Sequence, residues 1–133
     1  MTDVLLDTSA YSAHRRGHVE IAATIQAARS VAINSVALGE LLRGFRSGGR
    51  FDKNLRDLDR FRSSPRFRLL AVDEDTADCY SRIVIELRKM GTPIPSNDAW
   101  IAASALQHGL EILTTDPHFR RVPMLSVRCF GAL

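Results

Sequence analysis

The chain is short of lysine, of cysteine and of long apolar runs. Only Lys53 and Lys89 accompany 16 arginines. Cys79 and Cys129 lie far apart with no metal-type spacing, so we expect two reduced thiols, as in an intracellular protein. No apolar run approaches the roughly 20 residues of a membrane span, and residues 1–3 lack the basic-then-apolar pattern of a signal peptide. These absences predict a cytoplasmic protein with no membrane partner.

Several common catalytic motifs are absent as well. The sequence contains no Ser-His-Asp set, no glycine loop of the kind that cradles phosphates and no Gly-x-Gly-x-x-Gly stretch. What remains is the length and composition of one globular domain over residues 1–133, with 45% apolar and 25% charged residues.

The charge is distributed unevenly. Residues 43–68 carry nine cationic and three acidic side chains, a net charge of +6, which leaves −3 for the rest of the chain. A basic segment beside an acidic remainder suits a protein that binds phosphates at one place and cations at another. The alternative is a solvated helix face in an arginine-rich protein, and charge alone does not decide between the two.

Apolar runs and helical periodicities alternate along the chain. Residues 4–6 are three large apolar residues with no polar alternation, which is typical of a strand covered on both faces. The alternation of strands and helices predicts a parallel sheet with helices on both faces. Further strands are expected at residues 31–34, 67–72, 111–114 and 124–127. Helices are expected at 8–14, 51–61 and 96–108, along the apolar positions 21–28, after the cap Ser35 with apolar positions 38–45, and between the cap Asp73 and Gly91 with apolar positions 80–87.

Three acidic residues fall at the same predicted edge of this sheet. Asp7 follows the first strand, Asp116 follows the fourth, and Asp98 lies in the first turn of the helix between them. Each one alone is explained as a helix cap or a first-turn residue. Together they would repel one another by about 4 kcal/mol per pair at a separation of about 4 Å, so a cluster either has raised pKa values or binds a divalent cation. Oxygen ligands favour Mg²⁺ or Mn²⁺, which can assist phosphodiester cleavage.

Two other features stay open on periodicity alone. Glu40 lies about 150° from the apolar stripe of its helix (residues 38, 41, 42 and 45), so the helical wheel places it in solvent unless that side faces the cleft above the sheet. His14 and His18 stand four residues apart, a spacing that can bind metal on a helix. Gly17 interrupts that helix and no nearby acid completes a site, so we interpret the pair as surface histidines.

Four stretches of the sequence resemble PIN-domain ribonucleases, and among them the VapC-type toxins of bacterial toxin–antitoxin pairs. These stretches are residues 5–9 (LLDTS), 40–42 (ELL), 98–105 (DAWIAASA) and 113–119 (LTTDPHF). Any one motif is weak, but together they span nearly the whole chain in the family's order. The resemblance implies an α/β fold, a single PIN-like domain whose five-stranded parallel sheet has the order 3-2-1-4-5 with helices on both faces.

The resemblance also implies an acidic pocket that holds Mg²⁺ or Mn²⁺. Carried over by position, Asp7, Glu40, Asp98 and Asp116 form the catalytic quartet. Asp7 and Asp98 are the direct metal ligands, while Glu40 and Asp116 act directly or through water. Three hydroxyl residues are implied to shape the pocket: Thr8, Ser9 and Thr114.

The function implied is that of a metal-dependent endoribonuclease toxin. Its expected partners are an RNA substrate (a tRNA or an rRNA), a VapB-like antitoxin whose tail enters the pocket, and a second copy in a homodimer. The arginine-rich helices after Glu40 are the candidate surface for RNA and antitoxin. The alternatives are a non-catalytic RNA-binding or antitoxin-sequestering module with a vestigial pocket, and a phosphoacceptor signalling domain. The latter would be expected to have adjacent acids after the first strand and a late lysine, which this chain lacks.

Overall fold

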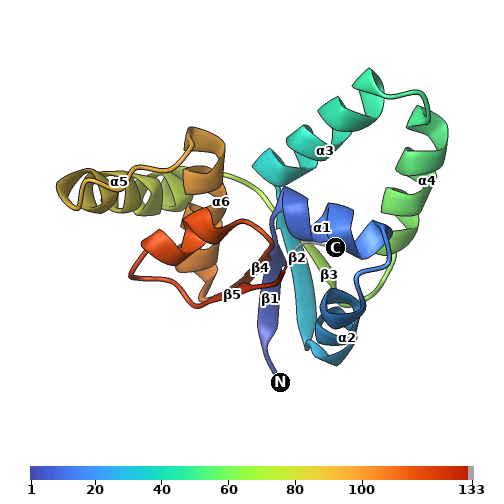
Figure 1. The fold of residues 1–133 in the computed structure, drawn as a ribbon, viewed down its shortest axis with the longest axis horizontal. Helices are drawn as coiled ribbons and strands as arrows, with labels where there is room; N and C mark the ends of the chain where they lie inside the picture. Colours follow the sequence, from blue (N-terminus) through green and yellow to red (C-terminus); the bar gives the residue numbers. More distant parts are fainter. Residues whose placement is uncertain (132–133) are drawn as a thin grey trace.

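The computed structural model of the protein describes residues 1–131. Five parallel strands form one sheet in the order β3-β2-β1-β4-β5, which confirms the expected topology (Figure 1). Every pairing is parallel, so the carboxyl ends of the strands share one edge. The strands are β1 (Asp3–Leu6), β2 (Ser30–Asn34), β3 (Phe67–Leu70), β4 (Glu111–Thr114) and β5 (Val127–Cys129).

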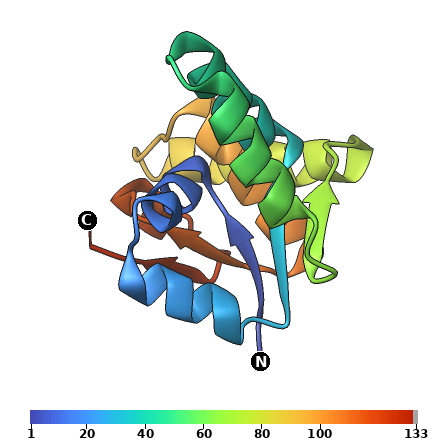
Figure 2. The same ribbon diagram turned by 90° about the vertical axis from the view of Figure 1, so that its right-hand side faces the viewer.

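Helices connect the strands and cover both faces of the sheet. As Figures 1 and 2 show, α1, α2 and α4 lie on one face, whereas α6 lies on the other with α5 packed outside it. None of the described helices has the length and apolarity that a membrane crossing needs. The helices are α1 (Thr8–Arg15), α2 (Val19–Ala27), α3 (Ser35–Ser47), α4 (Phe51–Arg62), α5 (Glu74–Lys89) and α6 (Ser96–His108), followed by the 3-10 helix η1 (Pro117–Arg121).

The centre of the core is the first strand. Val4, Leu5 and Leu6 are fully buried, as the unbroken apolar run predicts for a strand with helices above and below it. The edge strand β3 differs, because Arg68 and Leu69 are exposed there. The acid after β1 is therefore attached to the least mobile kind of backbone, a central strand paired on both sides.

Helix α6 packs closely on the sheet because its inner side chains are small. Ala102, Ala103, Ser104 and Ala105 are all buried, and left-handed Gly109 ends the helix as expected. The resulting short distance allows a side chain of β2 to reach α6 directly. Asn34 donates from Nδ2 to Ser104 Oγ (3.0 Å) and to the Trp100 carbonyl (3.2 Å).

The structure corrects the predicted cap of α3 and the ends of two strands. Asn34 caps α3 by accepting from the Ala37 N–H at 2.9 Å, whereas Ser35, the predicted cap, donates to the Leu70 carbonyl. Strand β3 ends at Leu70 and not at residue 72. Strand β5 begins at Val127 and not at residue 124. Residues 122–125 form a turn, closed by Leu125 N–H on the Val122 carbonyl, which keeps them out of the sheet.

The interpretation of His14 and His18 as surface residues is wrong. His18 is 6% exposed and caps α2, because its Nδ1 accepts from the Ile21 N–H while its Nε2 pairs with the Gly131 carbonyl at 2.8 Å. This pattern requires the proton on Nε2. His14 is half-buried against Phe61, and desolvation lowers its pKa. The His18 ring caps α2 and the His14 ring packs against Phe61 of α4, so the two rings do not form a shared metal site.

Replacing the cap of α3 should test this part of the fold. We expect Asn34→Ala to lower the free energy of unfolding by about 2–3 kcal/mol, because it removes a helix cap and leaves buried polar partners on α6. Ser35→Ala, the matched change one residue later, should cost only about 0.5 kcal/mol because Ser35 is exposed. Urea unfolding of both variants measures the difference. Equal losses would contradict Asn34 as the cap.

Candidate metal centre

Asp7 is a buried carboxylate held by three donors. It follows β1 and caps α1, and its side chain is 4% exposed. Its Oδ1 accepts from the Ala10 N–H at 2.8 Å, Thr114 donates from Oγ1 to Oδ2 at 2.6 Å, and the Ser9 hydroxyl lies within 2.9 Å of both oxygens. Each carboxylate has about four acceptor positions, so one direction stays free for another ligand.

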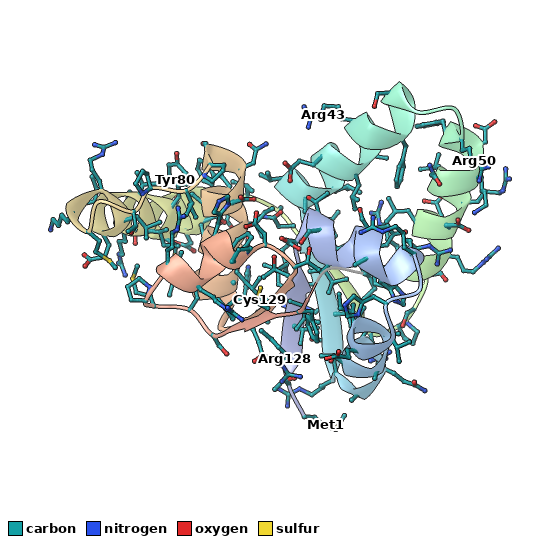
Figure 3. The ribbon with its side chains drawn as sticks, in the orientation of Figure 1. Met1, Arg43, Arg50, Tyr80, Arg128 and Cys129 are labelled. Atoms are coloured by element: carbon teal, nitrogen blue, oxygen red, sulfur yellow. The ribbon has the colours of Figure 1, made fainter. Side chains whose placement is uncertain are left out.

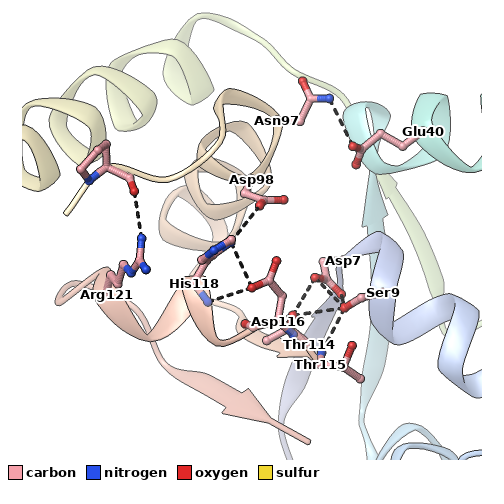
Figure 4. Close-up of polar contacts among 11 residues, drawn as sticks. Asp7, Ser9, Glu40, Asn97, Asp98, Thr114, Thr115, Asp116, His118 and Arg121 are labelled. Atoms are coloured by element: carbon pink, nitrogen blue, oxygen red, sulfur yellow. Dashed lines mark hydrogen bonds and ion pairs between the residues drawn. The ribbon is translucent and has the colours of Figure 1, made fainter. Parts of the chain in front are cut away.

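The same two hydroxyls connect the end of β1 to the end of β4. Ser9 Oγ accepts from the Thr115 N–H at 3.0 Å, and Thr114 Oγ1 accepts from the Asp116 N–H at 2.9 Å. Ser9 and Thr114, which the resemblance implied as pocket-shaping residues, therefore position two acids relative to one another. Asp7 and Asp116 come from adjacent strands and are fixed through this small network (Figure 4).

Glu40 is half-buried, and its carboxylate is close enough to the other acids to raise the pKa of Asp98. Thr8 donates from Oγ1 to Glu40 Oε1 at 2.7 Å, and Asn97 donates from Nδ2 to Oε2 at 3.2 Å. One donor comes from the start of α1 and the other from the start of α6, so the carboxylate of α3 is held between these two helix ends. Figure 4 shows the contact with Asn97. Thr8, the third implied hydroxyl, thus contacts a different acid from Ser9 and Thr114.

The most compact group of ligand atoms consists of Asp98, Asp116 and His118. One donor atom from each lies within 4.8 Å of the other two. His118 Nδ1 is 3.1 Å from Asp116 Oδ1 and 4.0 Å from Asp98 Oδ2. The shorter distance suits an ion pair, although this buried ring nitrogen has no hydrogen-bond partner. Asp7 and Glu40 lie around this group and not within it.

The charges act on one another across the cluster. Burial and, after it, the carboxylates of Asp116, Asp7 and Glu40 together raise the pKa of Asp98 to about 6, against the lowering effect of His118. Burial likewise raises the pKa of Asp7, against the lowering effect of its hydrogen bonds from Thr114, Ala10 and Ser9. Four acids that are distant in sequence therefore interact electrostatically, as the predicted edge of the sheet required. We call them the acidic quartet: Asp7, Glu40, Asp98 and Asp116.

Two polar residues of the site were not singled out from the sequence. Asn97 gives no periodic signal, because it lies in the first turn of α6 beside Asp98. For His118, the sequence Asp116-Pro117-His118 does indicate its position, because an acid before proline is typical of a helix cap. Pro117 begins η1, and Asp116 caps it by accepting from the backbone N–H of His118 at 2.9 Å. This cap places His118 next to the acid.

The donor atoms present fit a hard divalent cation. Carboxylate oxygens from four elements, together with one imidazole nitrogen, suit Mg²⁺ or Mn²⁺ better than zinc, which prefers closed sets of Cys and His. A cavity of about 470 Å³ at the opposite end of β1 is also lined by two acids, Asp3 and Glu111, but these pair with Arg29 and Arg128. The quartet is thus the candidate centre for a cation.

Comparison with known proteins finds the same fold in one family. A family model described as "PIN domain" matches residues 4–125. Ribonuclease VapC4 of Mycobacterium tuberculosis is 34% identical over 95 residues, which cover 71% of this chain and 73% of that protein.

Two solved structures extend the similarity to almost the full chain. DNA-bound VapBC from Salmonella typhimurium matches with a TM-score of 0.84 at 27% identity, covering 96% of this chain and 98% of that one. VapBC-5 from Mycobacterium tuberculosis, a member of the VapBC family of toxin–antitoxin systems, matches with a TM-score of 0.73 at 28% identity, covering 98% and 99%.

Removing one charge from the quartet should stabilise the metal-free protein at neutral pH. The folded-state pKa of the Asp98 carboxyl is raised from 3.8 to about 6. The free energy of unfolding of the protein therefore falls as the pH rises from about 4 to about 6, because the folded state has to release a proton that it binds more tightly than the unfolded state does. We expect Asp98→Asn to raise the free energy of unfolding at pH 7 by about 1–2 kcal/mol, a value reduced for partial solvent screening. The gain should shrink toward pH 4, where Asp98 is protonated.

Thermal and urea unfolding in EDTA at several pH values measure this gain. Asp78→Asn, at an exposed acid of α5 that pairs with Arg82, is the matched control and should change stability by less than about 0.5 kcal/mol. A loss of stability in Asp98→Asn at pH 7, or a gain independent of pH, would contradict the repulsion argued above.

Proposed function

The chain belongs to the PIN domain family, and from this premise we propose that it is a metal-dependent endoribonuclease that acts as the toxin of a toxin–antitoxin pair. The observation that carries the proposal is the acidic quartet: four carboxylates, from the end of β1, α3, α6 and the β4–η1 turn, converge so that burial and the charges of the other three acids raise the pKa of Asp98 to about 6. The similarity to Ribonuclease VapC4 supports RNA as the substrate class.

In this proposal Asp7 and Asp98 bind the cation directly, and Glu40 and Asp116 act directly or through water. A bound Mg²⁺ or Mn²⁺ would polarise a phosphate oxygen, lower the pKa of a water molecule and offset charge on the leaving oxygen. The chain's own contribution is to hold these acids charged and fixed. Ser9 and Thr114 stabilise the Asp7 carboxylate, and Thr8 and Asn97 orient Glu40.

The proposed reaction is an in-line displacement at phosphorus by water. A new bond forms between the water oxygen and phosphorus, the bond to the 3′ oxygen breaks, and that oxygen takes a proton. The products are 5′-phosphate and 3′-hydroxyl ends, and the 2′-hydroxyl is not the nucleophile.

RNA binding is assigned to the basic surface of α3 and α4. Arg43, one turn after Glu40 on α3, and Arg50, before α4, are exposed (Figure 3). Not every cation of residues 43–68 is available: Arg66 donates to the carbonyls of Ile25 and Ala28, and Lys53 pairs with Asp57. Exposed arginines on the helix that carries Glu40 and at the start of α4 suit contacts to the phosphates of a substrate strand.

The proposed protein partners are a VapB-like antitoxin and a second copy of the chain. The antitoxin is supported by the similarity to VapBC-5, a structure named as a toxin–antitoxin system. A tail that enters the acidic site would silence cleavage by occupying it, and co-purification with the product of the neighbouring reading frame tests this pairing.

Neutralising either direct ligand should abolish cleavage. We expect Asp7→Asn and Asp98→Asn each to lower the cleavage rate at least about 100-fold while the fold persists, because asparagine has similar shape but no charge for the cation. Gel assays with Mg²⁺, Mn²⁺ or EDTA and sequencing of RNA ends measure rate, metal dependence and chemistry. Glu20→Gln, at an exposed acid of α2, is the control that should retain full activity.

Three results would count against the proposal. Full activity in EDTA would contradict the dependence on a metal, and RNA ends with 2′,3′-cyclic phosphate would contradict attack by water. RNA binding unaffected by EDTA, with no turnover under any metal, would instead support the non-catalytic alternative.

Removing one exposed arginine near the quartet should weaken RNA binding in a salt-dependent way. We expect Arg43→Ala to reduce RNA affinity and to lower the slope of log K against log salt by about 1, because one phosphate contact is lost. Filter binding in EDTA, which prevents cleavage, measures both. Arg82→Ala on α5 removes the same charge far from residues 43–68 and should leave the slope unchanged.

A further inference from the structure

His118 is held rigidly against the acids although its side chain is 38% exposed. The backbone N–H of His118 donates to Asp116 Oδ1, and the neighbouring Phe119 is fully buried. Arg121, at the end of η1, donates to the Pro93 carbonyl at 3.0 Å. These contacts fix the backbone on both sides of the ring. The ring nitrogen Nδ1 is buried, has no hydrogen-bond partner and faces Asp116 and Asp98 (Figure 4).

The separations around Nδ1 are those of ligands to one ion. For bonds of about 2.1 Å in octahedral geometry, neighbouring ligand atoms lie about 3.0 Å apart and opposite ones about 4.2 Å apart. His118 Nδ1 is 3.1 Å from Asp116 Oδ1 and 4.0 Å from Asp98 Oδ2. One ligand atom from each of Asp98, Asp116 and His118 lies within 4.8 Å of the other two. The three side chains therefore lie close enough together to share one cation.

We propose that His118 Nδ1 is a ligand of the cation site together with Asp98 and Asp116, and that this nitrogen makes the site bind Mn²⁺ more tightly than Mg²⁺. The inference rests on the proposed function and adds to it a specific donor and a metal preference. Mg²⁺ prefers oxygen ligands and loses its bound waters slowly. Imidazole nitrogen is a common ligand of the divalent transition metals, and Mn²⁺ is the first member of their affinity order.

The competing explanation gives His118 a purely electrostatic role. A protonated ring beside Asp98 and Asp116 would offset their repulsion and leave no nitrogen for a metal. That arrangement would favour a hydrogen bond from Nδ1 to Asp116, whereas Nδ1 lies 3.1 Å from Asp116 Oδ1 without making one. The two explanations differ in whether nitrogen contacts the bound ion, which spectroscopy detects directly.

The test is pulsed electron paramagnetic resonance of the whole protein loaded with Mn²⁺. Electron spin echo modulation should show a directly bound ¹⁴N nucleus, and selective ¹⁵N-histidine labelling should replace that signal with the ¹⁵N pattern. This labelling needs no substitution, so it is independent of any folding defect. The signal should disappear in His118→Gln and persist in His108→Gln, a control at the exposed end of α6.

Titration calorimetry with each metal alone gives the affinity. The wild type should bind Mn²⁺ at least about tenfold more tightly than Mg²⁺, and His118→Gln should lose about tenfold in Mn²⁺ affinity with little change for Mg²⁺. Mn²⁺ binding without a histidine nitrogen signal, or with the same preference in His118→Gln, would overturn this inference alone. Failure of the wild type to bind either metal would overturn the proposed function as well.

Discussion

Repulsion among carboxylates gathered at one edge of the sheet is the constraint on which the rest of the site depends. Two such charges about 4 Å apart repel by about 4 kcal/mol at an effective dielectric of 20, and the fold brings four of them together. Folding alone does not favour this arrangement, so other interactions must hold it. Asp7 shows how: a backbone N–H and two hydroxyls bind its charge, while burial and Asp116 act against it.

The scaffold supplies the rigidity that such a cluster needs. Asp7 follows a fully buried central strand, and Asp98 begins a helix whose small residues pack directly on the sheet. Asn34 connects this helix to β2 and, by the same side chain, begins α3, the helix that carries Glu40. The positions of two acids, Asp98 and Glu40, therefore depend on the buried amide of Asn34. The geometry of the site is set by the packing of the helices as well as by the acids themselves.

Sequence reasoning recovered the parts of the fold that depend on apolar burial. The order of strands and helices, the central strand and the shared edge at Asp7, Asp98 and Asp116 all follow from apolar runs and from the handedness of crossovers. It failed where the outcome depends on competition between adjacent polar groups. Asn34 and Ser35 are both good caps, and only the proximity of α6 in the folded protein decides for Asn34. The burial of His18 likewise depends on Gly131, more than 100 residues later.

Glu40 shows why a polar site is harder to predict than a core. A helical wheel separates apolar from polar faces, and α3 presents its polar face partly to solvent and partly to the ends of α1 and α6. Glu40 lies on the second part, where Thr8 and Asn97 meet it, but its position on the wheel is the same as that of a solvated residue. Periodicity cannot distinguish the two, because the difference lies in elements that are remote in sequence. The family motif groups Glu40 with the other three acids, and the structure places its carboxylate close enough to act on Asp98, because the motif carries that remote information. The motif gave no role to His118, because the stretch around Asp116 was matched for its acid alone.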